Sequence, residues 1–277
     1  MPALSWGMRL GLWLSAMAAW GQTYEVTPDT ARQGDTLRVH AAGPASAARM
    51  NGRTIRLFPQ TGGGSLGLMP VAVDTAPGKY PVEFLDAASQ PLHSVPVAVR
   101  DARFPVQNVT LGKATAELQP APGEMEAVAA FRQTVTDTRY WADPLRAPVA
   151  GCMVSRFGVR RLINGKPTGN FHGGIDQRAA AGRGVAAVAP GVVRIVRMFN
   201  LNGGTVGVDH GQGLLSIYLH LSGFAVKEGA TVKQGEIIGL AGSTGRSSAP
   251  HLHWSLYANG VPVNPLQWVP LKPCAAR

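Results

Sequence analysis

Two short stretches of the sequence contain residues of the types that can bind metal ions. FHGGID places His172 and Asp176 four positions apart, with two glycines between them. HLHWSLY places His251 and His253 two positions apart, so on a β-strand both would project from the same face, about 7 Å apart. Catalytic zinc sites use three protein ligands drawn from His, Asp, Glu and Cys and leave a fourth position for water. His172, Asp176 and one histidine of the HLH pair would complete such a set.

A third histidine lies in a stretch of similar design. In LLSIYLHLS, strict alternation places Ser216, Tyr218 and His220 on one face of a strand and apolar side chains on the other. Taken singly, Asp176 could be a turn cap, and a strand histidine could be an ordinary hydrogen-bonded polar residue. Consecutive glycines disfavour a helix, so a tight turn entering a strand must bring His172 and Asp176 together. The combination of these residues favours a metal site.

The elements that must hold these side chains are mostly β-strands. The chain has 277 residues, 45% of them hydrophobic, enough for one large domain or two ordinary ones. Residues 22–106 contain short alternating runs broken by turn residues, which predict an immunoglobulin-like β-sandwich. Residues 107–146 are expected to form a linker with one amphipathic helix, and residues 147–277 an antiparallel β-sheet domain. We therefore predict a mainly β fold.

Residues 1–21 have the features of a secretory signal peptide. Arg9 precedes an apolar run from Leu10 to about Trp20, with small residues near its end. This run is about half of the ~20 residues that a transmembrane helix needs. We expect cleavage before Gln22 and a periplasmic or secreted protein without a stable membrane anchor. An uncleaved anchor is the alternative.

The two cysteines, Cys152 and Cys274, are expected to form an intramolecular disulfide. In an exported protein a single pair favours a disulfide over a metal site. Two separate thiols are the alternative.

The net charge alone does not decide which class of molecule the protein binds. A formal net charge of +10 favours polyanionic surroundings such as nucleic acid, anionic lipid or an acidic cell-wall polymer. The sequence has no Lys/Arg run with interleaved aromatics and no short nucleic-acid-binding motif. We therefore expect no nucleic-acid partner.

The C-terminal half resembles the LytM/lysostaphin-type zinc metallopeptidases, which cut peptide bonds in peptidoglycan. The matching stretches are SRFGVRR, HGGID, VDHGQGLLSIYLHLS, VKQGEIIGLAGSTGRSSAPHLHW and VNPLQW, in the family's order. Together they cover nearly all of residues 148–270. Ser248 and Ala249 stand where relatives often have Thr-Gly, a departure in the loop before the site. The N-terminal half resembles, more loosely, the immunoglobulin-like domain that precedes this domain in some secreted relatives.

The resemblance implies a role for each site residue. Zinc would be held by His172, Asp176 and His253. His220 and His251 would be the catalytic histidines beside the open position of the metal.

The same resemblance implies a zinc metalloendopeptidase, a peptidoglycan hydrolase acting on the cell wall. Because no wall-targeting module follows residue 274, we favour cross-links between D-alanine and diaminopimelate over glycine bridges. One alternative is a catalytically inactive regulator of cell-wall amidases, since some family members lack the zinc ligands. The other is a peptidoglycan-binding protein without activity.

Overall fold

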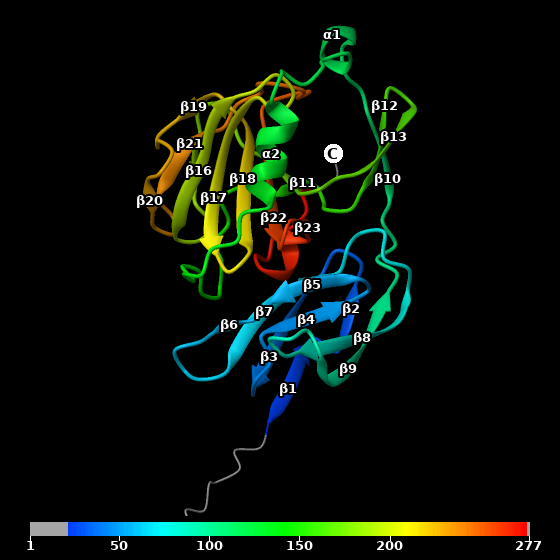
Figure 1. Cartoon of the computed structure of the whole chain (residues 1–277). Coiled ribbons are helices and arrows are strands. Elements are labelled where there is room, and N and C mark those ends of the chain that lie inside the picture. Colours follow the sequence, from blue (N-terminus) through cyan, green and yellow to red (C-terminus); the bar gives the residue numbers. More distant parts are fainter. Residues whose placement is uncertain (1–21, 276–277) are drawn as a thin grey trace, which may run out of the picture.

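The computed structural model describes residues 22–275, which form two β-rich regions in contact with each other (Figure 1). The predicted signal peptide, residues 1–21, lies outside the described residues. Within residues 22–275, no helix is both long enough and apolar enough to cross a membrane. The prediction of a mainly β fold is confirmed.

The N-terminal region consists of two sheets packed face to face. One has the order β1 (Thr23–Thr27), β3 (Thr36–Ala42), β7 (Ser65–Pro70) and β6 (Phe58–Pro59); the other has β2 (Thr30–Arg32), β9 (Pro91–Arg100), β8 (Gly78–Leu85), β4 (Ala47–Met50) and β5 (Arg53–Arg56). Inward side chains from both sheets, such as Val39, Phe84 and Val97, are buried in a common core. This arrangement is a β-sandwich. The more specific immunoglobulin-like topology stays a prediction.

The segment expected to be a linker is built into the C-terminal domain. It contains a single helical turn, α1 (Lys113–Ala116), and the helix α2 (Glu124–Arg132). Just before them, β10 (Val106–Val109) pairs in parallel with β12 (Arg160–Ile163). Phe131 of α2 is buried against Ile217 and Tyr257 of the large sheet, and α2 lies across the face of this sheet (Figure 1).

The C-terminal domain is organised around one large antiparallel sheet. Its order is β11 (Met153–Ser155), β14 (Ile175–Gln177), β22 (Leu252–Ala258), β18 (Leu214–Leu221), β17 (Gly204–Gly211), β16 (Gly191–Met198) and β20 (Thr231–Val232), with β23 (Val261–Val263) beside β22. A smaller sheet contains β15 (Gly184–Ala186), β21 (Ile237–Leu240) and β19 (Gly223–Phe224). A third sheet is formed by β10, β12 and β13 (Lys166–Phe171), and a 3-10 turn, η1 (Pro265–Gln267), follows β23.

The predicted disulfide between Cys152 and Cys274 is confirmed, and it closes a loop with a sequence separation of 122 residues. Met153 and Cys274 are also joined by a backbone hydrogen bond. The disulfide therefore ties the segment around Cys274 to β11, which pairs with β14. In the chain-entropy model, closing a loop of this length stabilises the folded state by about 4 to 5 kcal/mol.

The side chains of β18 do not follow the strict alternation expected from the sequence. Ser216 and Tyr218 are fully buried, and Tyr218 belongs to the same core cluster as Leu221. Side chains at positions 218 and 221 share a face because the chain bulges between them, and His220 has a positive φ of 62°. The expectation that His220 shares a face with Ser216 and Tyr218 is therefore wrong.

The β-sandwich also packs directly against the C-terminal domain. The backbone N–H of Thr36 donates to the Gln267 side chain at 2.7 Å, and the Asn259 amide donates to the carbonyl of Leu68, also at 2.7 Å. Phe157 packs directly over Gly34. These contacts fix the two domains against each other.

Candidate metal centre and active site

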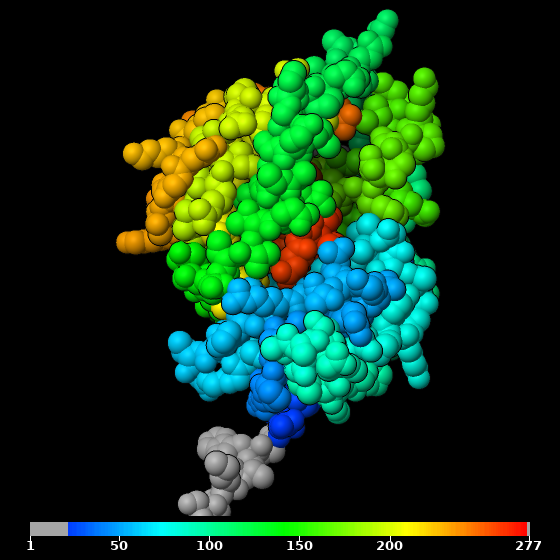
Figure 2. Space-filling view, viewed as in Figure 1, coloured from blue at the N-terminus to red at the C-terminus, as the bar shows by residue number. Residues whose placement is uncertain are grey.

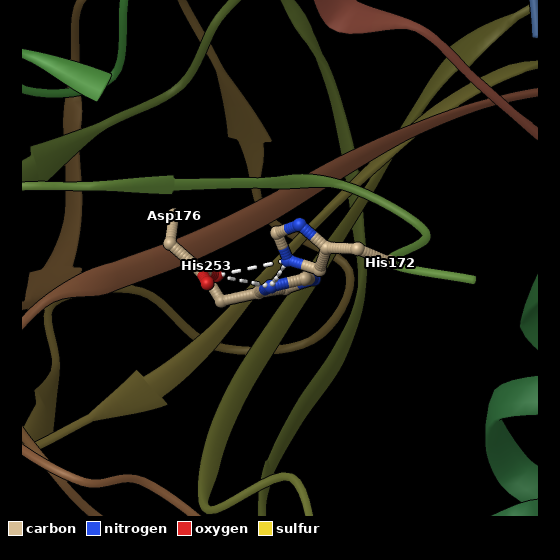
Figure 3. Close-up of side chains that lie close together, drawn as sticks. All are labelled: His172, Asp176 and His253. Carbon is tan, nitrogen blue, oxygen red and sulfur yellow. Dashed lines mark hydrogen bonds and ion pairs between the residues drawn. The ribbon is translucent and has the colours of Figure 1, made fainter. Parts of the chain in front are cut away.

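The predicted ligands His172, Asp176 and His253 lie together in the structure. Asp176 of β14 and His253 of β22 are directly opposite each other in an antiparallel pair, so their side chains project from the same face of the sheet. His172 follows β13 and reaches the same point from the loop that enters β14. Figure 3 shows the three side chains directed at one another.

Gly174 allows β14 to approach β22 closely enough for this arrangement. A Cβ atom at position 174 would lie 2.3 Å from the carbonyl oxygen of Trp254 and 2.9 Å from Nε2 of His253. At Gly173 the nearest atom to such a Cβ would be on Pro262, at 3.8 Å, which is an ordinary contact. Of the two glycines in FHGGID, only Gly174 is therefore required by close packing.

We expect Gly174→Ala to disrupt the site, whereas the matched control Gly173→Ala should be tolerated. The added methyl at 174 must displace the backbone of β22 and the His253 ring, and such overpacking costs about 1 to 3 kcal/mol. Zinc titration and thermal unfolding of both variants test this, with at least a tenfold weaker metal affinity expected for Gly174→Ala. Equal affinities in the two variants would contradict the packing argument.

The three donor atoms converge at distances suited to a metal ion. Nε2 of His172 lies 3.0 Å from Oδ1 of Asp176 and 3.0 Å from Nδ1 of His253, and the latter two atoms are 2.8 Å apart. Donor atoms of a tetrahedral zinc site with bonds of about 2.0 to 2.1 Å are separated by about 3.3 Å. A small expansion of the cluster would therefore accommodate the ion.

Hydrogen bonds behind the ligands leave their lone pairs facing one another. Nδ1–H of His172 donates to the carbonyl of Arg156 at 2.8 Å, so Nε2 carries no proton in the neutral ring. Nε2 of His253 contacts Oγ of Ser255 at 3.1 Å, and a proton on this nitrogen leaves Nδ1 free. Two imidazole lone pairs and a carboxylate oxygen then meet without a proton between them. A cation removes this repulsion, so the residues fit a metal ion.

Arg161 holds the second carboxylate oxygen of Asp176. Its guanidinium forms an ion pair with Oδ2 and also reaches Oγ of Ser155. Burial alone would raise the pKa of Asp176, but its interactions with His172 and His253 outweigh burial and hold the pKa well below its usual value. Asp176 is thus a carboxylate with one oxygen engaged by Arg161 and the other directed at the two histidines.

His220 and His251 lie next to this cluster. Their ring centroids are 5.0 Å apart, and Nε2 of His251 is 3.7 Å from Oδ1 of Asp176. Each ring is oriented by a backbone carbonyl, because Nδ1–H of His220 donates to Thr244 at 2.9 Å and that of His251 to Ala249 at 2.8 Å. In both neutral rings Nε2 is left free to accept a proton. Burial lowers the pKa of His220 to about 3, and the charges of His253 and His251 act in the same direction.

The cluster opens into a cavity of about 740 Å³. Its lining comes from β10, the β12–β13 hairpin, residues 201 and 202, and the loop before β22. A recess between α2 and the β12–β13 hairpin is visible in Figure 2. Among the described residues that line the cavity, Asp176 has the only carboxylate, whereas Arg161, Arg178 and Arg246 contribute three cations.

A buried glutamate at the start of α2 organises one wall of this cavity. The Glu124 carboxylate is fully buried and accepts hydrogen bonds from the backbone N–H groups of Asn200, Leu201 and Asn202 at 2.9 to 3.1 Å. The carbonyl of Asn202 in turn accepts from the backbone N–H of His220 at 3.0 Å. The helix is therefore connected to His220 through one loop.

We expect Glu124→Ala to lower the free energy of unfolding by about 1 to 3 kcal/mol, because it leaves buried amides without acceptors. Urea denaturation monitored by tryptophan fluorescence measures this. Glu126→Ala is the matched control, since Glu126 lies on the same turn of the helix and is exposed. Equal stability of the two variants would show that the Glu124 hydrogen bonds contribute little.

Reasoning from the sequence missed Arg161 and Glu124. Arg161 lies in an Arg-Arg pair, and its ion pair with Asp176 joins β12 to β14, two strands that are not neighbours in one sheet. Glu124 looks like an ordinary acidic residue in the first turn of a helix. His210, by contrast, is fully buried, and its ring contacts the carbonyl of Pro190 and the Ser216 hydroxyl, both at 2.7 Å. It lies outside the metal cluster.

The C-terminal part of the chain is similar to a known peptidase family. Residues 170–265 match the sequence model of peptidase family M23. DD-carboxypeptidase/endopeptidase Mpg of Neisseria meningitidis serogroup B is 44% identical over 99 residues, which cover 36% of this chain and 23% of Mpg. Peptidoglycan DD-endopeptidase ShyA of Vibrio cholerae is 39% identical over 113 residues, covering 41% of this chain and 26% of ShyA.

The likeness to one solved structure extends over both domains. A crystal structure from Pseudomonas aeruginosa, described as a candidate peptidase M23, has a TM-score of 0.65 and 28% sequence identity. The match covers 85% of this chain and 93% of that chain. In contrast, the present chain spans only about a quarter of the length of the two curated relatives.

Proposed function

Because its C-terminal domain places the chain in peptidase family M23, we propose that the protein is a zinc metalloendopeptidase that hydrolyses peptide cross-links of peptidoglycan. The observation that carries the proposal is the convergence of three metal-binding atoms, from His172, Asp176 and His253, in an open cavity. Two further histidines with free Nε2 atoms lie beside them. Such a constellation is suited to activating water rather than to closing a structural metal site.

The residues of the chain divide the chemistry between them. When bound, zinc supplies a Lewis acid that polarises the scissile carbonyl and lowers the pKa of water toward neutrality. His220 and His251 face the reacting atoms with Nε2, where they accept the proton of the attacking water and later return it to the leaving amine. A protonated ring also donates a hydrogen bond to the developing oxyanion. Arg161 orients the Asp176 carboxylate through its ion pair with Oδ2.

The substrate and location are proposed from the relatives. ShyA is named a peptidoglycan DD-endopeptidase, and Mpg a DD-carboxypeptidase/endopeptidase. We infer that this chain cuts bonds between D-alanine and diaminopimelate in the periplasm or outside the cell. Export by residues 1–21 and an immunoglobulin-like topology for the β-sandwich belong to the same proposal.

Digestion of purified sacculi tests this function directly. Mass spectrometry should detect uncross-linked muropeptides released by the protein with zinc, and a chelator should abolish their release. Binding to sacculi without release of products, in protein with one zinc ion per chain, would instead indicate a peptidoglycan-binding protein. Absence of metal from protein prepared without chelator would favour a catalytically inactive regulator.

A further inference from the structure

Arg246 has no acidic partner in the described part of the chain, although it lines the cavity beside the metal cluster. Arg161 is already engaged by Asp176, so Asp176 cannot neutralise both arginines. Burial lowers the pKa of Arg246, and the nearby charge of Arg161 lowers it further. The two cations therefore face the same space, and an anion in that space would relieve their repulsion.

The backbone at Arg246 is held in place. Its N–H donates to the carbonyl of Leu201 at 2.9 Å. The preceding Gly245 packs so closely on Gly203 that a Cβ there would lie 2.4 Å from the Gly203 nitrogen. Ser247, the next residue, contacts the His251 ring at 3.3 Å. Arg246 is thus presented from a fixed loop that also orients a histidine of the site.

We propose that Arg246 binds a free carboxylate on the substrate, next to the scissile bond. This inference rests on the proposed function and specifies the substrate class. In a cross-link between D-alanine and diaminopimelate, the carbon that bears the scissile nitrogen also carries a carboxylate. A guanidinium can bind such a group with two parallel hydrogen bonds. A glycine bridge, or a cross-link whose carboxylate is amidated, offers no negative charge at this position.

A binding experiment and a kinetic experiment test the proposal, each with a ligand in which this carboxylate is either free or amidated. The stem tetrapeptide that hydrolysis releases is prepared with this diaminopimelate carboxylate either free or amidated, and each form is titrated calorimetrically into the zinc-loaded full-length protein. Wild type should bind the free form about 10- to 100-fold more tightly, the range typical of a hydrogen-bonded charge pair. Arg246→Gln should lose this preference. Arg183→Gln, at an exposed arginine that does not line the cavity, should retain it.

Kinetics on the corresponding cross-linked dimers should show the same pattern, with KM raised more than kcat is lowered in Arg246→Gln. Equal affinity of wild type for the two tetrapeptides would overturn the role of Arg246, even if both dimers are hydrolysed. An equal loss of affinity for both forms in Arg246→Gln would also overturn it. Hydrolysis of neither dimer, with the binding preference intact, would overturn the proposed function alone.

Discussion

His220→Ala should lower kcat for cross-link hydrolysis by about 10²- to 10⁴-fold, the range for loss of a general acid–base group, while the protein keeps its metal. His220 contributes no atom to the cluster of His172, Asp176 and His253. Its Nδ1 is occupied by the carbonyl of Thr244, and its Nε2 is the atom available for proton transfer. Metal content by plasma emission spectrometry and kcat on cross-linked muropeptides are measured on the same preparation.

The backbone at position 220 requires a second variant. Because His220 has a φ of 62°, it lies in the left-handed region, which histidine adopts more readily than alanine. Asparagine tolerates this region better, so His220→Asn should fold like wild type and be equally inactive. Metal loss in both variants would make His220 a ligand, and near-normal kcat in His220→Asn would exclude it from catalysis.

Asp176→Ala should abolish both metal binding and hydrolysis. It removes the only carboxylate of the cluster and leaves Arg161 without its ion-pair partner beside two imidazoles. We expect zinc affinity to fall by more than about 100-fold, since even loss of a supporting partner behind a ligand costs 10- to 100-fold. Zinc-dependent stabilisation in thermal unfolding gives a readout that does not depend on activity.

His251→Ala is the matched control for Asp176→Ala. Its Nε2 lies only 3.7 Å from Oδ1 of Asp176, yet in our assignment it is no ligand. The variant should therefore retain zinc-dependent stabilisation and lose activity. Stoichiometric zinc in Asp176→Ala, or loss of zinc in His251→Ala, would require a different ligand set.

The residues of the site were predictable because metal ligands come from few residue types. His172, Asp176, His251 and His253 stood out by type and spacing, and the family resemblance assigned a role to each. The structure brings all of them together with His220. The path of His220 into the site was not predictable, since strict alternation placed it with Ser216 and Tyr218, which are in the core. A bulge depends on pairing with the neighbouring strand, which no local pattern records.

The fold was predictable at the level of two β-rich regions and a disulfide. Short alternating runs determine strands because one face of each must be buried. The contribution of residues 107–146 to the C-terminal domain could not be predicted from the sequence. Nothing in their pattern shows that β10 pairs with β12, or that Phe131 packs on the large sheet.

By itself, the sequence of this protein determined which atoms can bind a metal and which strands carry them, because residue type and periodicity are local properties. Only the tertiary structure decided which charged side chains lie near those atoms. It placed Arg161 on Asp176, connected Glu124 to His220 through one loop, and left Arg246 facing the cavity without an acidic partner among the described residues. Such pairings depend on distances between segments far apart in the chain, and these distances exist only once the sheets have packed.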